Sequence, residues 1–200
     1  MVRVGFKGRF RSRDQFMKLM PGEEISYKVS YLEMKNPPHF DWPPKPSGDL
    51  FVKNSVRPSS RYFFDLYRAV GAEYEWTDKY DEPIIELEKF LSNQFVRMFT
   101  FFKDGWTAGF FILDYREAKI CDLSYFGLVP EAIGFGYGEY LLKFAVKKSW
   151  ESNDIGVLTV NTNTLDHPSA LRLYKKVGFK IKRIEIEKRI LTQGRNIGSG

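Results

Sequence analysis

The stretch ICDLSYFGLVPEAIGFGYGEYLLKFAVKKSW, residues 120–150, decides the fold of this chain. Its apolar start predicts a strand, Gly134, Gly136 and Gly138 predict a turn, and apolar residues at helical spacing predict a helix from Tyr137 onward. Because glycine has no Cβ, the turn can approach a phosphate and point N–H groups at it, and the helix adds the positive end of its dipole. The stretch therefore predicts a site for a phosphorylated ligand. The alternative is a glycine-rich bend that tightens strand–helix packing.

The flanking sequence predicts further strands and helices. Ser59 and Ser60 resemble the N-cap of a helix that ends at Gly71, and Asp104-Gly105 favours a hairpin turn. Residues 36–47 hold five prolines and predict an extended loop, which either covers a substrate pocket or packs on the outside. The expected elements are strand 24–34, helix 60–71, a short helix from 83, strands 95–102, 106–114 and 119–128, the helix from 137, strand 157–160, a helix opening at 166–168 with Pro168 at its first position, and strand 179–190.

Two motifs carry a resemblance to a known family. Residues 128–138, LVPEAIGFGYG, are similar to the pattern Val-x-Pro-x-x-Arg/Gln-x-x-Gly-x-Gly/Ala, and residues 166–179, DHPSALRLYKKVGF, to Asn-x-x-Ala-x-x-Leu/Phe-Tyr-x-x-x-Gly-Phe. In this order and spacing they resemble the GNAT superfamily of acetyl-CoA-dependent N-acetyltransferases. The motifs cover about the C-terminal half, and residues before Glu75 match by order of elements only. Ile133 stands where the family has Arg or Gln, and His167 where Asn is common.

The resemblance implies an α/β fold with a mixed, mostly antiparallel central sheet and helices on both faces. The sheet is expected to splay between its fourth and fifth strands, residues 119–128 and 157–160, so that a cofactor can enter. One domain would span residues 21–200, preceded by a basic arm at residues 1–20.

The resemblance also implies a binding site for acetyl-CoA as co-substrate. The glycine turn would hold the pyrophosphate, and the end of the preceding strand would pair with pantetheine, with Gly127 as a candidate β-bulge residue. Asn161 and Asn163 either bind cofactor or substrate or cap their turn, and Glu139 is expected to point outward. The implied cofactor ligands are Phe126, Gly127, Leu128, Gly134, Phe135, Gly136, Tyr137, Gly138, Asn163 and His167.

Acyl transfer to an amine needs a base for the ammonium proton, a donor to the thioester oxygen and a donor to the leaving thiolate. Tyr174 matches the family's tyrosine and is the predicted general acid; the alternative is a core tyrosine on an apolar helix face. Asp122 interrupts an apolar strand and is the predicted base, directly or through a water; the alternative is pairing with Arg or Lys. The N–H of Leu128 would meet the thioester oxygen, and Cys121 is expected to be inert core.

The predicted function is transfer of an acetyl group from acetyl-CoA to a primary amine of a small molecule, amino acid or protein, by direct attack in a ternary complex. The alternative is a non-catalytic acyl-CoA-binding or sensing protein of the same fold. A dinucleotide oxidoreductase is disfavoured because the glycine spacing does not fit Gly-x-Gly-x-x-Gly. The sequence does not name the acceptor. Its pocket is expected to include Trp42, Tyr62, Trp76 and Tyr80.

Composition sets further limits. The chain has 200 residues, a formal net charge of +6 and a single cysteine, Cys121, so no intrachain disulfide can form. Cys121, His39 and His167 are scattered, and no metal site is expected. No apolar run is long enough to span a membrane and no signal peptide is visible, so we expect a cytoplasmic protein. The basic arm is expected to be a solvated terminus rather than a nucleic-acid site. The oligomeric state stays open, a homodimer included.

Overall fold

The structure is a computed structural model that describes residues 17–151 and 154–197. The chain divides into two compact units, one formed by residues 1–25 with 188–200 and the other by Ser26–Glu187. Most of the predicted basic arm lies outside the described residues, so its role and the predicted domain division stay predictions. No helix in the described residues is both long and apolar enough to cross a membrane.

The smaller unit is held together by backbone pairing. Its strands β1 (Met17–Leu19) and β9 (Arg195–Ile197) are antiparallel. The Gly22 N–H donates to the Leu191 carbonyl at 2.8 Å, and the Leu191 N–H donates to the Glu23 carbonyl at 3.0 Å. Neither strand is predictable from the sequence, because three residues are too few to show alternation.

The larger unit contains a seven-stranded sheet in the order β3-β4-β5-β6-β7-β2-β8. The pairings β3–β4, β4–β5, β5–β6 and β2–β7 are antiparallel, and β6–β7 is parallel. This mixed, mostly antiparallel sheet confirms the expected fold class. Its strands are β2 (Glu24–Met34), β3 (Leu50–Ser55), β4 (Val96–Lys103), β5 (Trp106–Asp114), β6 (Ile120–Leu128), β7 (Val157–Asn163) and β8 (Lys180–Ile190).

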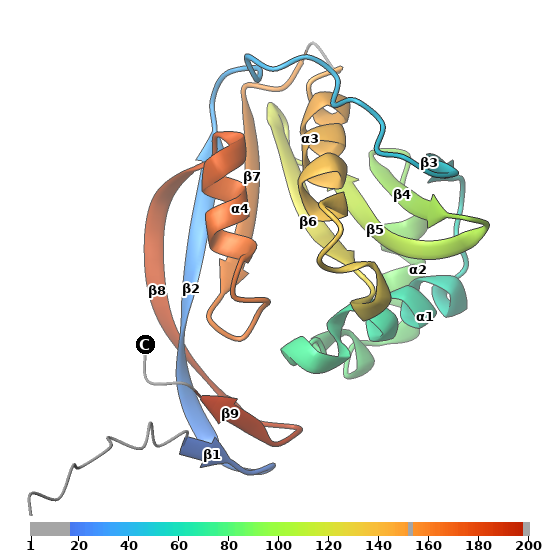
Figure 1. The fold of residues 1–200 in the computed structure, drawn as a ribbon. Helices are drawn as coiled ribbons and strands as arrows, with labels where there is room; N and C mark the ends of the chain where they lie inside the picture. The colour runs from blue at the N-terminus through green and yellow to red at the C-terminus, as the bar shows by residue number, and fades with distance from the viewer. Residues whose placement is uncertain (1–16, 152–153, 198–200) are drawn as a thin grey trace, which may run out of the picture. The chain divides into compact units, whose positions relative to one another are not determined.

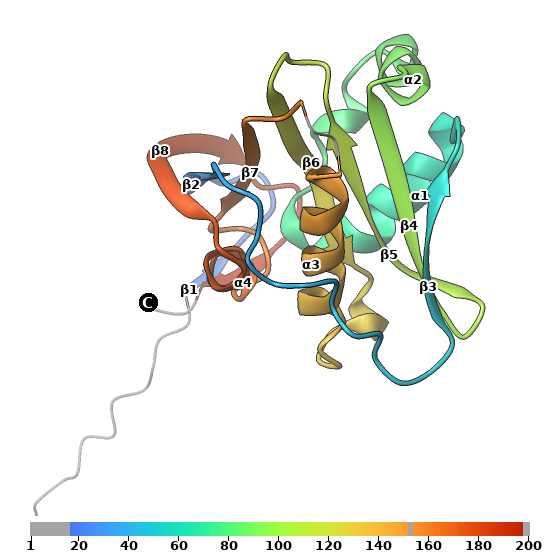
Figure 2. The same ribbon diagram turned by 90° about the horizontal axis from the view of Figure 1, so that it is seen from above.

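Helices cover both faces of the sheet, as expected. Helix α1 (Ser60–Gly71) packs on β5 and β6 and α2 (Ile84–Ser92) on β4, whereas α3 (Tyr137–Ser149) and α4 (Ala170–Val177) pack on β6 and β7. Figure 2 shows the two pairs of helices on opposite sides of the sheet. The expected N-cap of α1 is confirmed, since the Ser59 side chain accepts from the Tyr62 N–H at 3.2 Å.

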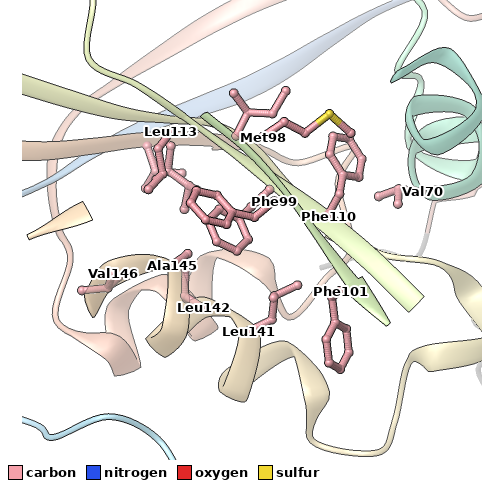
Figure 3. Close-up of a cluster of buried hydrophobic side chains, with 14 of the residues drawn as sticks. Val70, Met98, Phe99, Phe101, Phe110, Leu113, Leu141, Leu142, Ala145 and Val146 are labelled. Carbon is pink, nitrogen blue, oxygen red and sulfur yellow. The ribbon is translucent and has the colours of Figure 1, made fainter. Parts of the chain in front are cut away.

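Successive side chains of β5 point to opposite faces of the sheet, so this strand contributes to the core on both sides. Phe110 contacts Phe63 of α1, with 6.3 Å between ring centroids, while its neighbour Phe111 contacts Phe144 of α3 at the same centroid distance. Both phenylalanines are fully buried. Figure 3 shows the result: Phe99, Phe101 and Leu113 lie toward α3, and Met98 and Phe110 lie on the other side of the sheet.

The predicted splay is confirmed. Strand β6 pairs with β7 only over its first three residues, where Ile120, Cys121 and Asp122 face Val157, Leu158 and Thr159. Beyond Asp122 the two strands diverge (Figure 1). Residues 123–128 of β6 therefore pair with β5 on one side and with no strand on the other within the described sheet.

The proline-rich loop packs on the outside of α3. The Trp42 ring meets Phe144 edge-on at 5.0 Å between centroids, and the Lys143 ammonium lies 5.6 Å from the centre of the Phe40 ring. Trp42 thus lies on the α3 side of the sheet, whereas Tyr62 lies on α1. The expectation that Trp42 shares a pocket with the other three aromatic residues is wrong, because the prolines carry the loop across the opposite face (Figure 2).

Candidate active site

The glycine turn adopts the open backbone that the sequence predicted. Gly134 has φ +93° and Gly136 φ +79°, both in the region that favours glycine, and a Cβ at either would meet no atom within 4 Å. The turn is preceded by the short 3₁₀ helix η3 (Pro130–Ala132). A side chain would thus strain the backbone here without colliding with the protein, so the turn presents its backbone to open space.

The N-terminus of α3 is available to an anion. Its N-cap, Gly136, provides no side-chain hydrogen bond. Across the described residues, the N–H groups of residues 134–139 donate to no protein acceptor. The Tyr137 side chain is 7% exposed and lies 5.8 Å from Phe101 between ring centroids, and the exposed Phe135 of the turn stacks on its ring at 5.7 Å. Free N–H groups and the helix dipole together favour a phosphate-like group.

Glu139, in the first turn of α3, is neutralised by two lysines. Its carboxylate lies 2.9 Å from the Lys143 ammonium and 2.5 Å from the Lys176 ammonium of α4. The hydrogen bond from Lys176, followed by that from Lys143, lowers the pKa of the Glu139 carboxyl. The acidic residue therefore does not oppose an anion at the turn, because two cations accompany it.

The strand leading into the turn contains a bulge, but not at the expected residue. Ile112 of β5 faces Tyr125 while Leu113 faces Leu123, which leaves Ser124 as the extra residue on β6. Gly127 is regularly paired with Phe110. Gly127 is needed for close packing instead, since a Cβ there would lie 2.2 Å from Cγ1 of Val70 on α1. The prediction that Gly127 forms the bulge is wrong.

Asp122 lies where β6 and β7 part. It is half-buried, and its carboxylate accepts from Thr159 Oγ1 at 2.6 Å and from Ser124 Oγ at 2.7 Å. No Arg or Lys forms an ion pair with it within the described ranges 17–151 and 154–197. The structure therefore does not support the alternative that Asp122 pairs with an Arg or a Lys. Two hydroxyl donors hold the carboxylate without neutralising its charge.

Tyr174 packs beside the unpaired half of β6. It is 6% exposed, and its ring lies 6.0 Å from Phe126 of β6 and 5.8 Å from Phe179 between centroids. Burial, and to a lesser degree the charges of Asp166 and Asp122, raises the pKa of the Tyr174 phenol above its ordinary value. The phenol is therefore neutral at physiological pH and keeps its proton as a hydrogen-bond donor.

Asn163 and His167 serve the turn between β7 and α4. The Asn163 side-chain oxygen accepts from the Leu165 N–H at 2.7 Å, and His167 Nδ1 accepts from the Ser169 N–H at 3.2 Å. Asn163 therefore caps its own turn, as one of the two alternatives for it predicted. Contacts of Asn163 and His167 with a cofactor stay predictions. Asn161 is exposed on β7.

The same turn explains why α4 starts later than expected. The Asp166 carboxylate accepts from the Thr162 hydroxyl at 2.7 Å and from the Asn163 N–H at 2.9 Å, so it closes the turn back onto β7. The helix begins at Ala170, after the N-cap Ser169, and the expectation of Pro168 as its first residue is wrong. Gly178 ends the helix with φ +116°, as predicted.

Sequence reasoning missed several residues that build the site. Thr159 and Ser124 orient Asp122, and Trp76 links the segment after α1 to the β7–α4 turn by donating from Nε1 to Asp166 at 3.3 Å. Alternation along residues 157–163 could have placed Thr159 and Asp122 on one face. The Trp76 contact had no local signal, because the two residues are 90 positions apart.

A surface groove of about 530 Å³ lies at the other end of β6 from Asp122. It adjoins η3 and the final residues of α1, and so lies near the glycine turn rather than near the carboxylate. Its lining contains none of the four aromatic residues that were expected around the acceptor. The lining residues are Arg68, Ala69, Ala72, Glu73, Trp106, Thr107, Val129, Pro130 and Glu131.

Comparisons with known proteins agree with this geometry. The sequence model of the acetyltransferase (GNAT) family matches residues 35–179. The search of curated proteins found no match.

Among solved structures, the chain is similar to a GCN5-related N-acetyltransferase from Kribbella flavida, with a TM-score of 0.56 and 14% identity over 80% of this chain and 56% of that one. A GCN5-related N-acetyltransferase from Sphaerobacter thermophilus matches with a TM-score of 0.58 and 13% identity, covering 90% and 55%. An aminoglycoside acetyltransferase from an uncultured soil metagenomic sample matches with a TM-score of 0.52 and 17% identity, covering 64% and 87%. At these identities the likeness concerns the fold. The chain spans little more than half the length of the first two of these structures.

Proposed function

The chain belongs to the GNAT acetyltransferase family, and from this premise we propose that it transfers the acetyl group of acetyl-CoA to a primary amine by direct attack within a ternary complex. One observation carries the proposal: the half of β6 that leaves β7 leads, through the short helix η3, into a glycine turn whose N–H groups have no protein acceptor in the described chain. An extended ligand with a diphosphate at one end fits that arrangement.

Acetyl-CoA, when bound, supplies an acyl group activated as a thioester. The N–H groups of residues 134–138 would hold its diphosphate, helped by the α3 dipole and by Lys143 and Lys176 near Glu139. The unpaired backbone of Phe126, Gly127 and Leu128 would hydrogen-bond the amide-bearing arm as a neighbouring strand would. The Leu128 N–H would face the thioester oxygen. The free amides, the open space at Gly134 and Gly136 and the diverging strands all support this placement.

Asp122 would accept the proton of the incoming ammonium, directly or through a water. Its carboxylate is held by Thr159 and Ser124 and lies at the point where the strands part. An amine must lose this proton before its lone pair can attack a carbonyl carbon. No lysine or arginine among the described residues competes for the carboxylate.

Tyr174 would donate a hydrogen bond to the leaving sulfur. Because burial raises the pKa of its phenol above its ordinary value, complete proton transfer to a thiolate, whose conjugate acid has a pKa of about 8.5, is uphill. A hydrogen bond that strengthens as charge develops on sulfur still stabilises the leaving group. We therefore assign Tyr174 the role of donor to the thiolate rather than that of a fully ionising acid.

Two measurements test the proposal. Calorimetry with acetyl-CoA should detect binding, and thiol release with a panel of primary amines should detect turnover. Asp122→Asn should lower kcat by about 100-fold and Tyr174→Phe by about tenfold, with cofactor affinity nearly unchanged, because each removes a proton-transfer or donor group rather than a binding contact. Binding without turnover for every amine would favour the non-catalytic acyl-CoA-binding alternative. No uptake of acetyl-CoA would exclude both.

A further inference from the structure

Within residues 17–151 and 154–197, strand β8 forms an edge of the seven-stranded sheet and has β2 as its single neighbour. Its isoleucines are exposed: Ile181 by 39%, Ile184 by 54% and Ile186 by 73%. A long edge strand with apolar side chains and a free row of backbone donors and acceptors is a template for pairing with another strand. Short edges, prolines, bulges or charged side chains, lysine above all, usually prevent this. The sequence of β8, KIKRIEIEKRI, has no proline, and its charges are of both signs, so a partner strand with matching charges can pair with it.

The two faces of β8 differ in character. Arg183 lies over the Tyr31 ring of β2, 3.8 Å from its centre, and pairs with Glu185, while Glu187 accepts from the Tyr27 hydroxyl at 2.8 Å. These odd-numbered residues share one face. Ile184 and Ile186 lie on the opposite face, because side chains alternate along a strand. Lys182 and Lys188 flank the two isoleucines on that face and pair with Glu33 and Glu24 of β2. A partner must therefore match charges on one face and a central apolar pair on the other.

We propose that this partner is a second copy of the chain, with the two β8 strands antiparallel about a twofold axis at Ile184. In this register Ile184 faces Ile184 of the second copy. Arg183 faces Glu185 of the second copy, and the symmetry repeats that pair. With the pairs already present inside each chain, four alternating charges form one network. The sheet would continue across the interface.

Repulsion between like charges disfavours the neighbouring registers of the two β8 strands. A twofold axis at Arg183 would place Arg183 opposite itself, and an axis at Glu185 would place Glu185 opposite itself. An axis at Ile186 would place Glu185 opposite Glu187. Like charges directly opposite destabilise a ladder. In the Ile184 register the like-charged pair is Lys180 with Lys188, at the ends, where solvent and salt screen it.

Sedimentation of the full chain over a concentration series tests the interface. The wild-type protein should approach twice its monomer mass of 23.4 kDa. Ile184→Lys with Ile186→Lys should give monomer with an unchanged melting temperature. The matched control is Ile84→Lys with Ile85→Lys on α2, whose side chains are 50% and 51% exposed and which should leave the dimer intact. A monomeric wild type, or a dimer that survives the β8 substitutions, would overturn the proposal.

Cysteine cross-linking tests the register. Cys121 is fully buried and is the only cysteine, so background cross-linking should be low. Ile184→Cys should form an intermolecular disulfide under mild oxidation. Ile186→Cys should not, because in this register its two copies lie four residues apart along the ladder, roughly 13 Å, beyond the roughly 7 Å limit for Cα atoms in a disulfide. Equal cross-linking at both positions would contradict the register.

Charge reversal tests the ionic pairs. Arg183→Glu should weaken dimerisation by about tenfold, since it replaces two attractive cross-strand pairs by repulsive ones. Arg183→Glu combined with Glu185→Arg should restore the wild-type dissociation constant. Failure of the double substitution to restore it would show that these residues do not face each other, and would overturn the proposal.

Discussion

Two regions of this molecule use glycine for different physical reasons. In the sheet, a Cβ at Gly109 would lie 2.4 Å from the Gly127 carbonyl oxygen, and one at Gly127 would lie 2.2 Å from Val70. In the turn, a Cβ at Gly134 or Gly136 would meet nothing within 4 Å. The sheet glycines avoid collisions inside the protein. The turn glycines allow a backbone shape that faces empty space.

Glycines that lie within 30 residues of each other in the chain thus differ in what surrounds them, protein atoms in the sheet and open space at the turn. At Gly109 and Gly127 the neighbouring protein atoms explain the absence of a side chain. At Gly134 and Gly136 no protein atom does, and the positive φ that each adopts explains the glycine. The proposed ligand would use the N–H groups that this backbone exposes. Substitutions in the two regions should consequently fail in different assays.

The largest expected effect is on cofactor binding. Gly136→Val should strain the positive φ and displace the turn amides, and losing two or three charge-assisted hydrogen bonds should weaken acetyl-CoA binding by about 1,000-fold. Calorimetry measures this directly. The matched control is Gly105→Val in the β4–β5 hairpin, where φ is +83° and a Cβ would also meet nothing. It should cost similar stability and leave binding intact; equal loss of binding in both variants would point to general unfolding.

The next effect is on stability. Gly127→Ala places a methyl group against Val70 and should lower the free energy of unfolding by about 2–3 kcal/mol, as overpacking does. Val70→Ala should rescue it, because the next nearest atom to that Cβ is 3.6 Å away. Urea denaturation of the two single variants and the double variant gives the coupling energy. Additive losses would mean that the contact with Val70 is not the cause.

The smallest effect is the contribution of one buried tyrosine to the loss of stability in alkaline solution. Burial raises the pKa of Tyr115, Tyr125 and Tyr174 above their ordinary values. Above about pH 10 the unfolded chain loses these protons while the folded chain keeps them, so stability should fall by about 1.4 kcal/mol per pH unit for each tyrosine. Urea midpoints between pH 9 and 11 measure this. Tyr125→Phe should flatten the slope, and an already flat wild-type profile would contradict the burial.

Much of the fold was predictable because local patterns and tertiary packing agree. The alternation in β2, the Asp104-Gly105 hairpin, the Ser59 cap and the Gly178 terminator all lie where the sequence indicated. Strand β3 was missed because it follows the proline-rich loop and its six residues show little alternation. The start of α4 was misplaced because Asp166 bonds backward to β7 rather than forward to the helix.

Part of the candidate site, like part of the fold, was predicted from the sequence, and part was not. The glycine turn and Asp122 were predicted from residue types and spacing, and Tyr174 from the resemblance to the GNAT family. Their supporting contacts were not, since Thr159, Trp76 and Val70 reach the site from distant parts of the chain. The bulge was assigned to Gly127 on local grounds, yet it falls at Ser124, where the pairing with β5 shifts.

The sequence by itself determined most of the elements, the glycine turn and the family, because helix and strand periodicity, capping and short motifs are local properties of the chain. Tertiary structure alone decided where β6 leaves β7, which hydroxyls hold Asp122, and that the proline-rich loop lies against α3. Those features depend on the packing of residues distant in sequence, and a linear pattern does not encode which of many distant partners will meet.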